Sequence, residues 1–330
     1  MKIIKLCIGL LFAGGFVWLI IRQLDVNELM QLFATARLDV LAAALLAFLI
    51  GYACRIARWQ VMLKRDNPQL RWLDCAGPLL ASFAANNVLP FRAGDVMRTF
   101  AFNKQLGSNS STVLATLFVE RLLDLLMVLV LLGGALVFFE LDVNRFAGVG
   151  AAALIFLAIA ILTVLFFPRL FMPLANLVSN TVTRFLPDFG AKLGSWIENA
   201  LLTLDHLSGA GIMSNLIGWS LAAWLAEGGV FLYSAVALSA LPAPFASWLA
   251  LPVGTLATLI PSTPGYVGTF DYFIVRAMTA LNNPLTAATA YALLVHIVLW
   301  LPPTLIGGLY LLLRPTKLLL PGKHAHDLKS

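Results

Sequence analysis

Residues 86–95 read Asn-Asn-Val-Leu-Pro-Phe-Arg-Ala-Gly-Asp, and they interrupt a chain that is otherwise strongly apolar. A second interruption, residues 258–268, reads Thr-Leu-Ile-Pro-Ser-Thr-Pro-Gly-Tyr-Val-Gly. A shift of 171 positions places Pro90 on Pro261, and it also places a glycine of the first stretch on a glycine of the second. Paired interruptions of this kind in the two halves of a membrane protein are typical of a transport site between structural repeats. We therefore expect the two stretches to meet in the folded chain.

The composition indicates an integral membrane protein. Of the 330 residues, 60% are hydrophobic and only 12% are charged, whereas soluble domains contain roughly 25% charged residues. The cysteines, Cys7, Cys54 and Cys75, stand singly in apolar stretches, so we expect small core side chains rather than disulfides or a metal site. The chain contains no Gly-rich nucleotide-binding loop. We expect a single membrane domain over residues 1–330, without a cofactor and without affinity for nucleic acid.

Hydrophobic stretches predict the helices that cross the bilayer. A spanning helix needs about 20 apolar residues. Two further apolar runs, about 73–89 and 246–260, are too short to cross and return, and each ends in one of the interruptions. They predict the first halves of two re-entrant hairpins, whose second halves are about 93–105 and 267–281. Six stretches are long enough to span, at approximately 3–21, 39–61, 112–139, 148–168, 212–240 and 285–313.

Lysine and arginine set the expected orientation. With the N-terminus inside, 17 of the 22 basic residues fall on the cytoplasmic side, Arg55 and Arg58 among them, and 4 fall on the other side. We expect the first stretch to be retained as a signal anchor, because no small-x-small cleavage site precedes Arg22. The helix at 112–139 then runs outward and the helix at 285–313 runs inward. This predicts an inverted repeat with both termini in the cytoplasm.

The predicted fold is therefore an all-α polytopic membrane protein with about six spanning helices and two re-entrant helical hairpins. The first half covers about 1–140 and the second about 148–315. Between them, residues of about 170–211 mix apolar side chains with basic ones. That pattern favours helices that lie along the cytoplasmic surface and serve interfacial packing.

The expected third span carries three charged residues, Glu120, Arg121 and Asp124. An isolated charge at mid-helix costs about 2.5–3.5 kcal/mol, so such residues face a protein interior or a water-filled cavity and are paired. Glu120 and Asp124 share a helix face, and Arg121 is three residues from Asp124. One interpretation is that this acidic face anchors a cation of the first hairpin, Arg92 or Arg98, and organises a substrate cavity. The alternative is a purely structural pair that locks the hairpin against the helix.

The first interruption carries the polar residues Asn87, Arg92, Asp95 and Arg98. Irregular backbone at membrane depth is tolerated only where it is buried in protein or lines water. Two guanidinium groups beside a helix start could hold an anionic headgroup by bidentate hydrogen bonds. The alternative is that both arginines lie among cytoplasmic headgroups.

The second interruption contributes Ser262, Thr263, Gly265 and Gly268. Its hydroxyl groups and free backbone amides could bind a phosphate or another polar headgroup. The alternative is that its glycines and prolines only turn the chain. We interpret these four residues as part of the same cavity.

Two further ionisable residues stand alone in expected spans, Glu227 and His296. Each is a candidate for proton coupling, because its charge can change with its access to water. The alternative for each is a hydrogen bond to a neighbouring helix.

Three motifs, at 87–98, 120–124 and 261–268, resemble those of the transmembrane, flippase-like domain of lysylphosphatidylglycerol synthases. They read Asn-x-x-Leu-Pro-x-Arg-x-Gly-Asp-x-x-Arg, Glu-Arg-x-x-Asp and Pro-x-x-Pro-Gly-x-x-Gly, and the resemblance covers nearly the whole chain. It implies a polytopic fold that moves a phospholipid or a lipid-linked headgroup between leaflets. The chain departs from the family pattern at Tyr266, where a glycine is usual, and at Asp271, where a glutamate is usual. It also lacks an aminoacyl-transferase domain, so we expect no lysyl transfer to lipid.

Three functional hypotheses follow. The first is a translocase of the bacterial inner membrane whose partner is an anionic phospholipid or a lipid-linked headgroup. The second is an intramembrane enzyme that acts on a lipid or polyprenyl phosphate, with Asp95, Glu120 or His296 as acid or base. The third is a scaffold for a separate lipid-modifying enzyme. The sequence names neither the lipid nor the oligomeric state.

Overall fold

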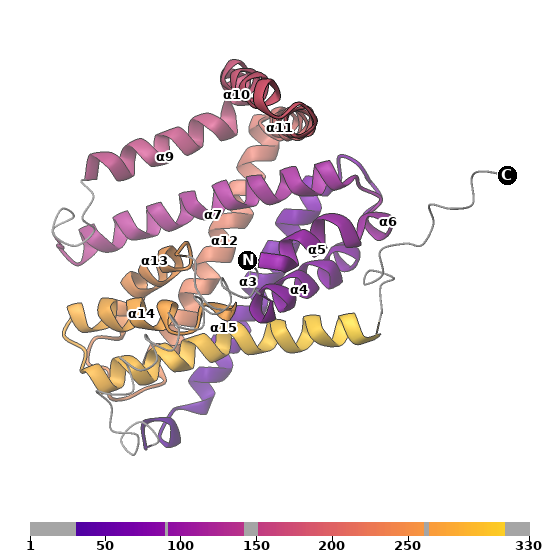
Figure 1. The fold of residues 1–330 in the computed structure, drawn as a ribbon. Helices are drawn as coiled ribbons and strands as arrows, with labels where there is room; N and C mark the ends of the chain where they lie inside the picture. Colours follow the sequence, from indigo (N-terminus) through magenta and orange to yellow (C-terminus); the bar gives the residue numbers. More distant parts are fainter. Residues whose placement is uncertain (1–30, 90–91, 142–150, 261–263, 314–330) are drawn as a thin grey trace.

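The computed structural model describes residues 31–89, 92–141, 151–260 and 264–313. All regular elements in these ranges are helices, and none is a strand, so the predicted all-α class is confirmed (Figure 1). Four of the helices are long and apolar enough to cross a membrane: α3 (Leu38–Leu63), α7 (Ser110–Phe138), α12 (Ala210–Val236) and α15 (Leu285–Leu313).

The bounds of these four helices differ from those of the predicted spans by at most four residues. The expected first span, 3–21, lies outside the described residues. The expected fourth span is represented by α9 (Ala151–Phe166), which runs through η2 (Pro168–Phe171) into α10 (Met172–Phe185) with a bend of 103°. Pro168 accounts for the bend, because proline has no backbone N–H and disfavours helical geometry in the residue before it. Counted as one broken span, this pair raises the candidate crossings to five.

Both interruptions separate the arms of a short helical hairpin, as the sequence predicts. In each hairpin the two arms pack against one another. The depth of these hairpins in the bilayer stays a prediction. The first hairpin consists of α4 (Trp72–Val88), α5 (Ala93–Ala101) and α6 (Asn103–Leu106), and the second of η3 (Pro244–Ala246), α13 (Ser247–Ala257), η4 (Pro264–Tyr266) and α14 (Thr269–Ala280).

The two halves exchange packing partners. Helix α3 packs along α12, α4 of the first hairpin packs along α15 of the second half, and α13 of the second hairpin packs on α7 of the first (Figure 1). The α4–α15 contact is close because α15 has Gly307 where a Cβ would lie 2.1 Å from the carbonyl oxygen of Leu80. This exchange is what an internal repeat would produce, and the inversion of that repeat stays a prediction. Cys54 and Cys75 are buried free thiols, as expected of core residues.

Helices α10 and α11 (Pro187–Leu207) form an antiparallel pair at one end of the molecule (Figure 1). Arg169 of η2, just before α10, donates two hydrogen bonds to Asp205 of α11, at 2.7 and 2.8 Å. These hydrogen bonds hold the pKa of Asp205 below its ordinary value, so the carboxylate stays ionised at mildly acidic pH. The segment predicted at about 170–211 is therefore helical, and its position along the cytoplasmic surface stays a prediction.

Candidate functional site

The two interruptions meet through their side chains. Arg92 Nε donates a hydrogen bond to Tyr266 Oη at 3.0 Å, and its guanidinium carbon lies 6.0 Å from the centroid of the tyrosine ring. Asn87 Nδ2 donates to Thr304 Oγ1 of α15 at 2.8 Å. The carbonyl oxygen of Asn87 lies 3.3 Å from the point that a Cβ on Gly265 would occupy. Residues 174 to 217 positions apart in the sequence thus form one contact, which we call the hairpin junction.

The backbone at the hairpin junction is strained on both sides. Arg92 has φ of +51° and Tyr266 has φ of +60°. This left-handed conformation costs a residue with a Cβ about 1–2 kcal/mol, whereas Gly265 and Gly268 adopt it freely. Strained residues that touch each other often mark a functional contact. Ser262 and Thr263 lie outside the described residues.

A buried ion pair joins α5 to α7. Arg98 Nη2 lies 2.5 Å from Glu120 Oε2, and the two side chains are 2% and 7% exposed. The Arg98 guanidinium also stacks on Trp59 of α3, 4.0 Å from the ring centroid. The acidic face of α7 therefore anchors a cation of the first hairpin. The structure places Arg98 in this contact rather than among headgroups.

A second ion pair between α5 and α7 is more open. Arg121 Nη2 lies 2.9 Å from Asp95 Oδ2, and the side chains are 42% and 21% exposed. Asn86 Nδ2 donates to the other Asp95 oxygen at 2.9 Å. Helix α5 approaches α4 closely enough for this because Gly94 has no Cβ, which would lie 1.9 Å from the carbonyl oxygen of Ser82. Arg121 thus reaches across to the first hairpin instead of pairing along its own helix.

Asp124 of α7 is held by residues of α3 and α12. Arg58 Nη1 lies 2.8 Å from Asp124 Oδ1, and Trp224 Nε1 donates to the same oxygen at 3.2 Å. Arg58 also donates to Ser220 Oγ at 2.9 Å. Arg55 Nη1 approaches Asp124 less closely, at 3.8 Å.

Arg55 has a closer partner, because its Nη2 forms an ion pair with Glu227 Oε2 of α12. The expectation that Glu227 stands alone is therefore wrong. Arg55 and Arg58, which the charge count assigns to the cytoplasmic side, are buried in these pairs, and the side of the membrane stays a prediction. Their partners come from helices distant in sequence, which a charge count along the chain does not register. We call Arg55, Arg58, Asp124 and Glu227 the three-helix network.

His296 is paired as well, with a residue of a neighbouring helix, as the alternative interpretation expected. Its Nδ1 lies 2.7 Å from Asp271 Oδ1 of α14. The other oxygen of Asp271 accepts a hydrogen bond from the backbone N–H of Gly268 at 2.8 Å. Asp271 thus caps the start of α14 and orients the imidazole of α15 at the same time.

Comparison with known proteins bears on the same segments. The family described as the lysylphosphatidylglycerol synthase TM region matches residues 6–307. The chain belongs to this family. A curated relative, the glycosyltransferase AglD of Haloferax volcanii, is 26% identical over 313 residues, which cover 86% of this chain and 50% of the relative. The chain thus spans about half the length of that relative. No solved structure matches it.

In this member of the lysylphosphatidylglycerol synthase TM family, the motifs that suggested the family lie at the contacts described above. The first motif supplies the α5 side of both α5–α7 pairs, and the second supplies the α7 side. The departure at Tyr266 provides the hydroxyl that meets Arg92. The departure at Asp271 provides the carboxylate that holds His296.

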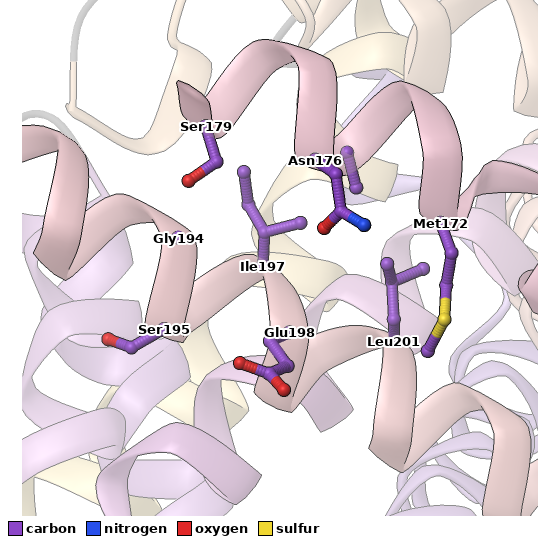
Figure 2. A pocket seen from close by; sticks show the side chains of 9 residues that line it. Met172, Asn176, Ser179, Gly194, Ser195, Ile197, Glu198 and Leu201 are labelled. Atoms are coloured by element: carbon purple, nitrogen blue, oxygen red, sulfur yellow. The ribbon is translucent and has the colours of Figure 1, made fainter. Parts of the chain in front are cut away.

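A cleft of about 390 Å³ opens between α10 and α11, on other elements than the hairpin junction and the ion pairs (Figure 2). Figure 2 shows Asn176 and Ser179 on one helix facing Ile197 and Glu198 on the other. The lining of the cleft combines amide, hydroxyl and carboxylate groups with aliphatic side chains, and it contains no basic residue. An anionic headgroup would therefore find no counter-charge there. The lining residues are Met172, Ala175, Asn176, Ser179, Gly194, Ser195, Ile197, Glu198 and Leu201.

Proposed function

We propose that this protein moves an anionic phospholipid or lipid-linked headgroup between the leaflets of the bacterial inner membrane, with both of its termini in the cytoplasm. The observation that carries the proposal is the hairpin junction. Two broken hairpins from different halves touch there through an arginine and a tyrosine. Family membership supports a role in membrane lipid metabolism.

Arg92 is the residue best placed to receive a headgroup. Its side chain is partly exposed, and its described hydrogen bond goes to the neutral phenol of Tyr266. A phosphate accepts charge-assisted hydrogen bonds that are about twice as strong as those of a neutral acceptor. A phosphate can therefore displace the phenol, and the two hairpins then separate. The hairpin junction acts as a gate that the substrate itself opens.

The remaining charges support a polar route past this gate. Asp95 and Arg121 are ionised and partly exposed on the face of α5 and α7. Charged side chains in a membrane segment are tolerated where they line a cavity or are paired. Pairing keeps the empty protein stable, and partial exposure leaves the groups accessible to water or to a headgroup.

We expect purified protein to accelerate exchange of headgroup-labelled phosphatidylglycerol in vesicles of phosphatidylethanolamine and phosphatidylglycerol. The readout is loss of label fluorescence after addition of a membrane-impermeant reductant. Arg92→Ala should slow exchange by about tenfold or more, the equivalent of at least one charge-assisted hydrogen bond. Arg92→Lys should retain part of the rate, because it keeps the charge but loses the bidentate fork.

Arg276→Ala is the matched control, since Arg276 is an exposed arginine of the second hairpin and its loss should leave the rate unchanged. Correct folding of each variant is checked by its elution as a single species in detergent. Absence of exchange with the wild-type protein across anionic and zwitterionic lipids would refute the proposal.

The curated relative favours a second candidate function. AglD carries the name glycosyltransferase, and the present chain spans half of it. The membrane domain could therefore serve as the lipid-presenting partner of a separate lipid-modifying enzyme. Co-purification with such an enzyme, together with full tolerance of Arg92→Ala, would support this function over translocation.

A further inference from the structure

The three-helix network is balanced in charge. Its described members are two cations of α3, Arg55 and Arg58, and two anions, Asp124 of α7 and Glu227 of α12. The pairing is uneven, because Asp124 contacts both arginines while Glu227 contacts only Arg55. Removal of the Glu227 charge would leave two guanidinium groups sharing a single carboxylate.

The two carboxylates, of Asp124 and Glu227, also differ in the number of groups that donate hydrogen bonds to them. Asp124 accepts hydrogen bonds from Arg58 and from Trp224. Glu227 has the Arg55 contact, and its side chain is 20% exposed. Loss of the Asp124 charge would remove an acceptor shared by Arg58 and Trp224, whereas loss of the Glu227 charge would remove a partner of Arg55 alone. Glu227 is therefore the carboxylate whose neutralisation frees Arg55 and leaves Arg58 paired.

Few other ionisable groups face Glu227. Glu227 is the one charged residue of α12, and α9, α13 and η3, which pack on α12, have none in their described ranges. The groups of the network and its immediate surroundings are Tyr52, Arg55 and Arg58 of α3 and Asp124 of α7. The other ionisable residues of α12 and of the helices packed on it are Asp39 and Cys54 of α3, Glu120 and Arg121 of α7, Tyr233 of α12, and Tyr291, His296 and Tyr310 of α15.

We propose that Glu227 and Arg55 form a proton-linked phosphate site: protonation of Glu227 releases Arg55, which then binds the phosphate anion of the transported lipid. In the empty state Glu227 is ionised and neutralises Arg55. In the loaded state the anion takes that place and Glu227 carries the proton. The net charge of the site is zero in both states, which a low-dielectric surrounding requires.

Two features of the structure prepare Arg55 for this exchange. Its guanidinium carbon lies 5.3 Å from the centroid of the Trp224 ring. This cation–π contact holds the guanidinium in place when the ion pair with Glu227 is broken. Arg58 Nε, in a side chain that is almost fully buried, has no hydrogen-bond partner among the described residues. A buried donor without a partner beside the released guanidinium is a second point of attachment for an anion.

The inference rests on the proposed function and gives it an energy source. Uptake of one proton with each anion couples lipid movement to the proton gradient. Coupling is reciprocal, so the anion raises the proton affinity of Glu227 by the factor by which the proton raises the affinity for the anion. One proton per anion corresponds to a tenfold change in anion affinity per pH unit while Glu227 titrates.

The test is proton uptake by the purified protein in weakly buffered detergent, followed with a pH indicator. Addition of phosphatidylglycerol at pH 6–8 should take up close to one proton per protein bound, and phosphatidylcholine should take up none. Uptake with phosphatidylglycerol alone assigns the site to the lipid, and uptake with inorganic phosphate as well assigns it to any phosphate anion. Lipid binding without proton uptake would overturn the inference and leave the proposed translocation standing.

Glu227→Gln provides the second arm. This variant should bind phosphatidylglycerol equally well at pH 6 and pH 8 and take up no proton, whereas wild-type affinity should fall by about tenfold or more over that range. His296→Gln is the control for the other buried titratable pair and should keep the wild-type pH dependence. If Glu227→Gln retains that pH dependence, or if His296→Gln abolishes it, Glu227 is not the coupling group. Absence of lipid binding and transport in the wild type would instead refute the proposed function itself.

Discussion

Glu120→Ala is expected to destabilise the folded protein by about 3–5 kcal/mol, because it leaves the buried Arg98 guanidinium without its counter-charge. The Arg98–Glu120 pair is the most enclosed of the described ion pairs between spanning helices and hairpins. It is also a contact that holds α5 on α7. Unfolding in detergent, by heat or denaturant, measures the loss.

Two comparisons show whether the charge causes the effect. Joint replacement, Arg98→Met with Glu120→Leu, should recover most of the stability, because a buried ion pair contributes little more than an apolar pair of similar volume. Asp39→Ala removes the partner of an exposed pair with Arg37 and should leave the transition unchanged. A wild-type transition for Glu120→Ala would show that the pair is not formed in the folded protein.

Gly307→Ala should destabilise the protein by about 1–3 kcal/mol, the usual cost of forcing extra volume into a packed contact. The new Cβ would lie 2.1 Å from the backbone oxygen of Leu80, and backbone cannot move aside as a side chain can. Helix α15 would then be pushed away from α4. Because α4 leads into the hairpin junction, the variant should also lose lipid exchange.

The neighbouring glycine is a matched control. A Cβ on Gly308 meets nothing within 4 Å in the described structure. Gly308→Ala should therefore be neutral or stabilise the helix by up to about 1 kcal/mol, the difference in helix propensity between the two residues. Equal behaviour of the two variants in a thermal scan would mean that α15 does not pack on α4 as described.

Much of the architecture could be predicted from local sequence. Long apolar runs such as 112–139 predict helices of the correct extent, because the bilayer requires a certain length and a satisfied backbone. Pro and Gly in the two interruptions predict breaks, because proline cannot donate to a helix and glycine permits left-handed backbone. These effects act within a few residues, and a single sequence reports them directly.

The site was predicted only in part. The acidic face of α7 was expected to anchor a hairpin cation, and Glu120 does hold Arg98. A hydrogen bond to a neighbouring helix was the alternative for Glu227 and His296, but the partners, Arg55 and Asp271, were not named, because each comes from another helix. One local signal was available for the arginines of α3: Arg55 and Arg58 are three residues apart inside an apolar stretch, so they share one helix face and need buried counter-charges.

The sequence by itself determined the helical class, the breaks in the two hairpins and the three charges of α7 that need partners. Only the tertiary structure decided which charges neutralise which, and that Arg92 and Tyr266 meet. The physical reason is one of range. Helix formation and chain breaking depend on neighbours along the chain, whereas ion pairing depends on the rotation and register of packed helices, which the whole set of contacts determines.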